Sequence, residues 1–309
     1  MSRAAFVPPM LARLVADPPD GDGWVYERKL DGLRCIAVRA GARIELWSRS
    51  KQSFTGRFGG IVAAMADLPV DDVVLDGEIV ALEGDRTSFA LLQRPGSKAK
   101  PLLYVFDVLH LAGEDLTGRP LLERKQALAE VAGKRGVIRR VDHVEGDPAV
   151  LLAEACAAGW EGLIAKRADG PYRSGRSADW LKLKCSASQE LVIGGWTEPR
   201  GARSHFGALL VGYYDSEGRL RYAGKVGTGF GAATLTDLHR RMTAASRDSS
   251  PFADRVWEKG AHWTEPRLVA NIAFTEWTDD GKLRHPRYEG LRPDKNAREV
   301  VREAEAQGT

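Results

Sequence analysis

Alternating hydrophobic and polar residues mark short strands in the first half of the chain. The run at 24–28 alternates, and the runs at 33–38 and 43–47 are separated by a four-residue turn, so we expect a β-hairpin there. Longer runs at 73–82 and 102–109 are apolar and rich in β-branched residues, and they predict buried strands.

Helical spacing alternates with these strands. Apolar residues recur at intervals of three and four over 58–68 and 121–132, and Asp147-Pro148 is typical of the start of a third helix. The runs at 162–166 and 180–184 are again strand-like. This mixture predicts an α+β fold more than a regular βαβ alternation.

The pattern changes near residues 186–188. After this point four strand-like runs are separated by glycine-rich or charged turns, and one helical stretch at 234–245 interrupts them. Such an order suits a small barrel such as an OB-fold. We therefore predict one domain over 1–187 and a second over 188–309. The four runs are 190–196, 205–214, 220–226 and 268–277.

Composition narrows the class of protein only a little. The net charge of +3, from 45 basic and 42 acidic residues, permits nucleic-acid binding without indicating it. No apolar run approaches the ~18 residues of a membrane span. Residues 1–23, rich in Pro, Asp and Gly, predict an irregular lead-in without the apolar core of a signal peptide. Cys35, Cys156 and Cys185 form no CxxC pair, which argues against a zinc knuckle and suits a reducing cytoplasm.

The run Lys29-Leu30-Asp31-Gly32 is the first candidate for chemistry. A lysine is a good nucleophile only when neutral, and its ordinary pKa is about 10.4, so a nearby cation or metal must favour the neutral form. Gly32 would let the backbone pass close to a nucleotide. Taken alone, the run fits a solvated lysine that ends a strand before a turn better than a catalytic lysine.

Six further runs place charged or aromatic residues at or inside apolar strands. Each has an ordinary structural explanation: a carboxylate at a sheet edge, an aromatic in the core, or two lysines on the wet face of one strand. In chain order they are Trp47-Ser48-Arg49-Ser50, Leu75-Asp76-Gly77-Glu78-Ile79, Tyr104-Val105-Phe106-Asp107, Glu161-Gly162-Leu163-Ile164-Ala165-Lys166, Trp180-Leu181-Lys182-Leu183-Lys184 and Arg292-Pro293-Asp294-Lys295.

Together and in this order, the runs resemble the motifs of the covalent nucleotidyltransferase superfamily, which comprises ATP-dependent DNA ligases, RNA ligases and mRNA capping enzymes. The set reaches from Lys29 to Lys295, and the opening Phe6-Val7-Pro8-Pro9-Met10-Leu11 is most similar to compact bacterial DNA ligases and the ligase module of end joining. The resemblance implies an N-terminal nucleotidyltransferase (adenylation) domain of mixed antiparallel sheets with helices, followed by a C-terminal OB-fold β-barrel.

The resemblance also implies roles at the nucleotide. Lys29 would attack the α-phosphate of ATP and carry AMP as a covalent adduct. Phe106 would stack on the adenine ring, because the face of an aromatic ring suits a flat base. The backbone around Glu27 and Arg28 would read the adenine edge, and Arg34 would contact the ribose.

Phosphate and metal binding are implied in the same way. Glu78 and Glu161 would hold a divalent cation, Mg²⁺ or Mn²⁺, because oxygen ligands suit these ions and not zinc. Lys182 and Lys184 would neutralise the α-phosphate as its charge develops. The other residues expected at the nucleotide are Arg49, Lys166, Arg176, Asp294 and Lys295.

The expectations for these other residues differ. Arg49 would lie near the nucleotide and the 5′-phosphate of a nick. Arg176 fits equally well a nucleotide-site arginine and a basic loop that contacts DNA phosphates. Asp294 and Lys295 would swing over the nucleotide during self-adenylation, with a hinge near residues 186–188.

The implied activity is the sealing of nicks or breaks in duplex DNA between 3′-hydroxyl and 5′-phosphate ends, in DNA repair or end joining. An RNA ligase or a capping-type nucleotidyltransferase is the first alternative, and a non-catalytic OB-fold nucleic-acid-binding protein is the second. We expect a cytoplasmic monomer at the bacterial nucleoid. The pathway stays open between replication backup, nick repair and end joining, and so does dependence on the end-binding Ku protein.

Overall fold

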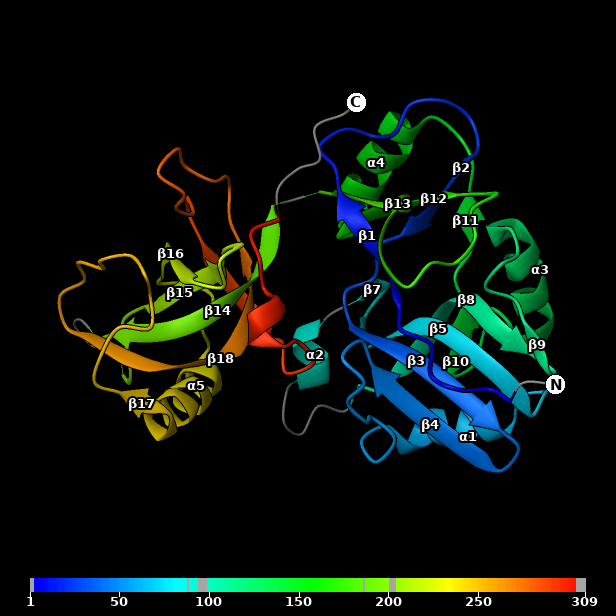
Figure 1. Ribbon diagram of the computed structural model, residues 1–309, viewed down its shortest axis with the longest axis horizontal. Helices are drawn as coiled ribbons and strands as arrows, with labels where there is room; N and C mark the ends of the chain where they lie inside the picture. The colour runs from blue at the N-terminus through cyan, green and yellow to red at the C-terminus, as the bar shows by residue number, and fades with distance from the viewer. Residues whose placement is uncertain (1–2, 88, 94–98, 186, 200–203, 304–309) are drawn as a thin grey trace. The chain divides into compact units, whose positions relative to one another are not determined.

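The structure is a computed structural model, and it describes residues 3–87, 89–93, 99–185, 187–199 and 204–303 (Figure 1). The chain divides into two compact units. The N-terminal unit ends at Cys185, and the C-terminal unit comprises Ser186–Glu303. Across the described ranges, no helix combines the length and the apolar character needed to cross a membrane.

The first sheet of the N-terminal unit joins distant parts of the chain. Its first strand, Met10–Leu14, pairs in parallel with a strand more than 160 residues later, so the prediction of an irregular lead-in was wrong here. The other pairs are antiparallel. In spatial order the strands are β1 (Met10–Leu14), β13 (Gly175–Lys184), β12 (Gly162–Arg167), β2 (Trp24–Arg28) and β11 (His143–Val144).

A second sheet contains the predicted hairpin and both predicted buried strands. Its order is β10 (Ile138–Arg140), β8 (Leu102–Leu111), β5 (Asp72–Val80), β3 (Leu33–Ala40) and β4 (Arg43–Ser48), with β9 (Glu114–Asp115) beside β8. Helices α1 (Gly59–Ala66) and α3 (Leu121–Val131) bury apolar residues in one core with this sheet. A second core contains residues of this sheet together with Met10 of β1 and Trp180 of β13, and the candidate site lies beside it.

The remaining elements of the N-terminal unit are short. Asp147 caps α4 (Pro148–Ala157), and its side chain accepts hydrogen bonds from the N–H groups of Ala149 and Val150, as the Asp-Pro pair predicts. The strands β6 (Leu82–Glu83) and β7 (Arg86–Thr87) form a small hairpin before α2 (Phe89–Gln93).

A disulfide bond joins Cys156 at the end of α4 to Cys185 directly after β13, with 5.3 Å between the two Cα atoms. The two residues are 29 positions apart, and the sparse cysteine count does not predict this pair, because spacing alone cannot reveal connectivity. Cys35 is free and buried, and burial raises the pKa of its thiol.

The C-terminal unit is one six-stranded sheet with an interposed helix. The predicted helix is present as α5 (Ala232–Ala244), which buries Leu235, Leu238 and Met242 against the sheet. In spatial order the strands are β16 (Leu220–Val226), β15 (Leu209–Tyr214), β14 (Ser188–Thr197), β18 (Ala261–Ala273) and β17 (Ser246–Arg247), with β19 (Arg287–Leu291) beside β18 and the short 3₁₀ helix η1 (Ala297–Glu299) following.

Candidate functional site

Lys29 directly follows β2, and its backbone N–H donates to the carbonyl of Gly162 over 2.9 Å. Its partly buried ammonium forms an ion pair with Glu161. Burial acts to lower the pKa of Lys29, but the carboxylates of Glu161, Asp31 and Glu78 outweigh burial and raise this pKa above its ordinary value. The structure therefore brings both predicted metal-binding glutamates close to the predicted nucleophile.

The Asp-Gly pair after Lys29 is explained by contacts within the protein. Asp31 accepts a hydrogen bond from the N–H of Phe89 over 3.2 Å, and its own N–H donates to Thr87, so it ties the lysine to the β7–α2 segment. A Cβ at position 32 would lie 2.2 Å from the carbonyl oxygen of Ile79. The close contact that requires a glycine at position 32 is therefore with β5. The expected approach of this backbone to a nucleotide stays a prediction.

Arg34 is held in the wall of the site by a buried carboxylate. Its guanidinium donates two hydrogen bonds of 2.6 Å to Asp76, and the hydroxyl of Tyr172 donates a third to the same carboxylate. The Asp76 pair outweighs burial and raises the pKa of Arg34, so this side chain stays charged. Asp76 is thus a supporting residue that the sequence did not single out.

The ring of Phe106 is almost buried and lies between charged and aromatic neighbours. The ammonium of Lys166 is 4.4 Å from its centroid, and the guanidinium of Arg34 is 4.6 Å from it. Trp180 packs edge-on against the same ring and lies 4.0 Å from the Lys166 ammonium. A cation that lies over the face of an aromatic ring is attracted to that ring. Phe106 therefore belongs to a cation–aromatic cluster with Trp180, which the sequence did not reveal.

Glu27 is almost fully buried and lies between two lysines. Its carboxylate is 2.6 Å from the ammonium of Lys125 and 2.8 Å from that of Lys166. Burial acts to raise the pKa of Glu27, but the two ammonium groups outweigh it and lower this pKa. Burial, with Lys125 nearby, lowers the pKa of Lys166 to about 8 despite Glu27.

Lys125 is a site residue that the sequence analysis missed. It lies on the buried face of α3 with Leu121, Leu128 and Val131, and it also donates to the carbonyl of Phe106 over 3.4 Å. A lysine at this spacing interrupts an apolar stripe, and a charge on a buried helix face needs a partner. The lysine within this apolar stripe was the sequence signal that could have identified Lys125 as a site residue.

The two lysines of β13 alternate with the buried Leu183. Lys184 is paired in register with Gly162, next to Glu161, and Lys182 is paired with Ile164 on one side and with Leu14 of β1 on the other. Gly162 has a φ of +146°, and a Cβ there would lie 1.9 Å from the carbonyl oxygen of Leu183. This glycine allows β12 and β13 to approach at the site.

Three predicted arginines lie at different places around the N-terminal unit. Arg28 donates to the carbonyl of Asp85 over 2.9 Å and lies over the ring of Trp160. Arg49 occupies the turn after β4, where Ser48 accepts from the N–H of Gln52 over 2.9 Å. Arg176 is exposed on β13, not in a loop, and donates to the carbonyl of Ala12. Asp294 and Lys295 belong to the C-terminal unit.

The carboxylates near Lys29 suit a cation that takes most of its ligands from elsewhere. Nowhere in the described part of the chain do three or more His, Cys, Asp or Glu side chains gather in a way that could hold a metal ion. Mg²⁺ commonly uses one or two carboxylates and completes its shell with water and substrate phosphates. Glu78 and Glu161 are two carboxylates and match this mode of Mg²⁺ coordination. They are too few to hold a metal ion through protein ligands alone.

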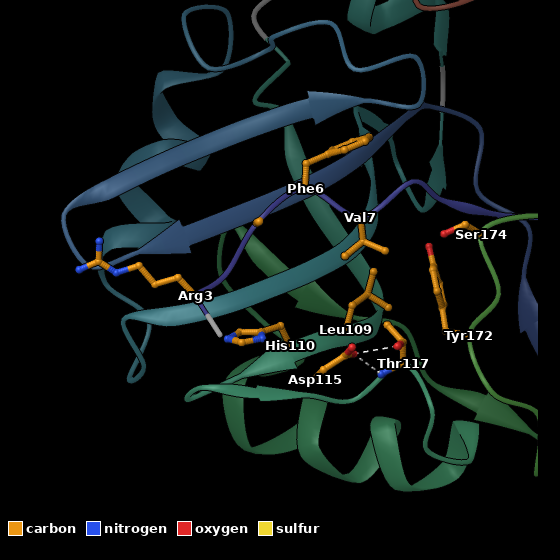
Figure 2. Close-up of a pocket in the computed structure, with 10 residues that line it drawn as sticks. Arg3, Phe6, Val7, Leu109, His110, Asp115, Thr117, Tyr172 and Ser174 are labelled. Carbon is orange, nitrogen blue, oxygen red and sulfur yellow. Dashed lines mark hydrogen bonds between the residues drawn. The ribbon is translucent and has the colours of Figure 1, made fainter. Parts of the chain in front are cut away.

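A separate pocket of about 260 Å³ opens on the N-terminal unit and contains none of the predicted site residues (Figure 2). Residues of the N-terminal segment, Phe6 and Val7 among them, line it opposite His110 and Asp115. Tyr172 also lines this pocket, and its hydroxyl bonds to the Asp76 carboxylate that holds Arg34. The pocket therefore shares one side chain with the wall of the candidate site.

Comparison with known families identifies the class of protein. The model of the ATP dependent DNA ligase domain matches residues 9–184, and that of the ATP dependent DNA ligase C terminal region matches residues 202–295. The chain belongs to the ATP-dependent DNA ligases. The predicted fold class is confirmed: a nucleotidyltransferase domain of mixed sheets with helices, followed by an OB-fold domain.

Individual relatives agree with this assignment. The multifunctional non-homologous end joining protein LigD of Pseudomonas aeruginosa is 41% identical over 312 residues, which cover 97% of this chain and 37% of that protein. DNA ligase C of Mycobacterium tuberculosis is 30% identical, with 88% of this chain and 79% of that protein covered. The chain thus spans a little over a third of the LigD proteins that it matches.

A solved structure supports the same assignment. The mycobacterial DNA ligase D complexed with ATP and MES is 35% identical, superposes with a TM-score of 0.66, and is covered over 98% of its length and 95% of this chain. That structure is a complex with ATP, which supports the use of ATP by this family.

Proposed function

We propose that this chain seals strand breaks in duplex DNA through a covalent lysyl–AMP intermediate on Lys29. The observation that carries the proposal is the environment of this amine. It is partly buried, it is ion-paired with Glu161, and the carboxylate of Glu78 lies near enough to affect its pKa. An ordinary solvated lysine at the end of a strand has no need of such neighbours.

In the first step, one proton leaves the Lys29 ammonium for water. The amine then forms a bond to the α-phosphorus of ATP as the bond from this phosphorus to the α–β bridging oxygen breaks. Pyrophosphate leaves, and the attached nitrogen loses a second proton to water, which gives the phosphoramidate. Because Glu161 holds Lys29 in its protonated form, this carboxylate must turn away before the attack. Lys182 and Lys184 would stabilise the charge on the α-phosphate oxygens. An oxygen of the 5′-phosphate next attacks the phosphorus of AMP, the bond from that phosphorus to the Lys29 nitrogen breaks, and the amine takes up a proton. The 3′-hydroxyl then loses its proton to water, forms a bond to the phosphorus of the 5′-phosphate and displaces AMP.

We propose the cation–aromatic cluster around Phe106 as the adenine site. A base stacked on Phe106 needs a ring face that Lys166 or Arg34 now covers, so one of these cations must shift when ATP binds. The buried Glu27 carboxylate can accept a hydrogen bond from the adenine amino group, whereas the carbonyl of guanine would repel it. Arg49 and Arg176 are proposed to contact phosphates of the nucleotide or the DNA.

We assign Glu78 and Glu161 to a divalent cation, Mg²⁺ or Mn²⁺, which would supply positive charge at the phosphates. Both are hard oxygen ligands, as these ions require. An ammonium and a divalent cation compete for Glu161, so binding of the cation would free Lys29 for deprotonation.

The central test is transfer of label. Incubation with Mg²⁺ and α-labelled ATP should give a labelled protein band on a denaturing gel, and Lys29→Ala should abolish it. Lys134→Ala, which removes an exposed lysine paired with Asp142, is the control and should label normally. An unlabelled wild type, or equal labelling of Lys29→Ala, would refute the proposal. Labelling from GTP in place of ATP would indicate a capping-type enzyme.

We further propose a role in end joining. We also keep the domain boundary at 187/188 as a proposal, two residues after the last residue of the first unit, Cys185. The relatives named for non-homologous end joining support this role, although the chain spans only part of their length. The distinguishing measurement compares nick sealing with double-strand end joining, each with and without the end-binding Ku protein. Stimulation of end joining alone by Ku would support the pathway. Sealing confined to nicked RNA would point to an RNA ligase.

A further inference from the structure

Four charged side chains of the C-terminal unit form ion pairs with one another. Arg292 donates two hydrogen bonds to Asp294, over 3.0 and 2.9 Å, and Asp294 is almost completely buried. The ammonium of Lys295 is 3.1 Å from the carboxylate of Glu190, and the guanidinium of Arg292 is 3.7 Å from the same oxygen. Two cations are thus balanced by two carboxylates.

Glu190 reaches this cluster from a different strand. It lies on β14, opposite Asn271 of β18, whereas Arg292 follows β19 and donates its N–H to the carbonyl of Val269 over 2.7 Å. Gln189, the residue before Glu190, donates to the carbonyl of Val301 and accepts from the N–H of Glu303. Two adjacent side chains of β14 therefore bind two parts of the chain: Glu190 binds the 292–295 segment, and Gln189 binds the 301–303 segment.

We propose that Glu190 is a positioning residue that holds Lys295 and Arg292 on their own domain, and that the phosphates of ATP compete with it for Lys295. The inference rests on the proposed lysyl–AMP reaction and on the role of Lys295 at the triphosphate that the family resemblance implies. An ammonium paired with a partly buried carboxylate must give up that pair before it can bind pyrophosphate. The strength of the Glu190–Lys295 ion pair thereby determines how easily Lys295 becomes available to the phosphates.

The decisive variant is Glu190→Gln, which keeps the shape and the hydrogen-bond acceptor but removes the charge. It should increase the rate of lysyl–AMP formation at subsaturating ATP by about two- to fivefold, the range expected for loss of one partly exposed ion pair. The KM for pyrophosphate in the reverse reaction should fall by a similar factor. A residue that only supports the fold would lower the rate instead.

Two controls separate this role from a general effect. Glu258→Gln removes a carboxylate of similar exposure that pairs with Lys225 in the same unit, and it should leave the rate unchanged. In a Lys295→Ala background, Glu190→Gln should have no further effect, because the residue acts through Lys295. Equal rates for Glu190→Gln and wild type, or an undiminished effect in the Lys295→Ala background, would overturn the inference. An unlabelled wild type would instead overturn the proposed function itself.

Discussion

At the scale of single residues, the site holds two lysines whose pKa values are shifted in opposite directions. Lys29 pairs with a carboxylate near the surface, and its pKa is raised. Lys166 is buried deeper and lies near a second lysine, and its pKa is lowered to about 8. The proposed nucleophile is therefore stored in its inactive, protonated form, and activation requires a change at Glu161.

This leads to a prediction for the pKa of Lys29. Glu161→Gln should lower it, because the carboxylate that favours the ammonium is gone, whereas Glu78→Gln should lower it less, because the influence of Glu161 on this pKa is larger than that of Glu78. The measurement is a pH titration of ¹³C-labelled lysine side chains by NMR, without nucleotide or metal, with the Lys29 signal assigned from Lys29→Ala. An equal effect of both variants would contradict the ion pair.

The sequence identified residues with motifs but not their supporting partners. Lys29, Glu78 and Glu161 were expected at one site, and the structure brings them together. Asp76 was visible only as part of a motif strand, and its role depends on Arg34 and on the distant Tyr172. Such pairs form only when strands far apart in sequence become neighbours, so a local pattern cannot reveal them.

At the scale of elements, the approach of β12 to β13 is the contact on which the site depends. It places Lys184 opposite Gly162 and next to Glu161. We predict that Gly162→Ala destabilises the protein by about 2–4 kcal/mol, because a Cβ would meet the carbonyl of Leu183 in a backbone conformation that favours glycine.

Urea unfolding tests this prediction, with Gly56→Ala as its control. Position 56 has open space around its Cα and no left-handed φ, so that variant should change the free energy of unfolding by less than about 0.5 kcal/mol. If both variants unfold at the same urea concentration, the strand contact is looser than described.

Hydrophobic periodicity predicted the helices and strands whose conformation follows from their own local sequence. The hairpin β3–β4, the buried strands β5 and β8, and α3, α4 and α5 all lie where the pattern placed them. Strand β1 was missed, and β13 begins five residues earlier than its predicted run at 180–184. These two segments are extended because they pair with each other. Pro8 and Pro9 directly before β1, and Gly175 and Ser177 in the first part of β13, disguise this.

At the scale of the whole molecule, the disulfide fixes the last residue of the N-terminal unit to α4. Closing a loop of 29 residues is worth about 3.6 kcal/mol by the chain-entropy estimate. We predict that a thiol reductant lowers the melting temperature of the wild type. Cys156→Ser should melt at that lower temperature with or without reductant. A wild type that is indifferent to reductant would show that the bond does not form in solution.

The pairing of β1 with β13 also bears on how the protein is handled. Removing the first fourteen residues, which the sequence predicts to be part of an irregular lead-in, would remove β1 from its place beside β13, the strand that carries Lys182 and Lys184. Arg3 lines the pocket in Figure 2, so an affinity tag joined to Arg3 would be attached beside that pocket. Purification handles and fluorescent labels should therefore be attached elsewhere.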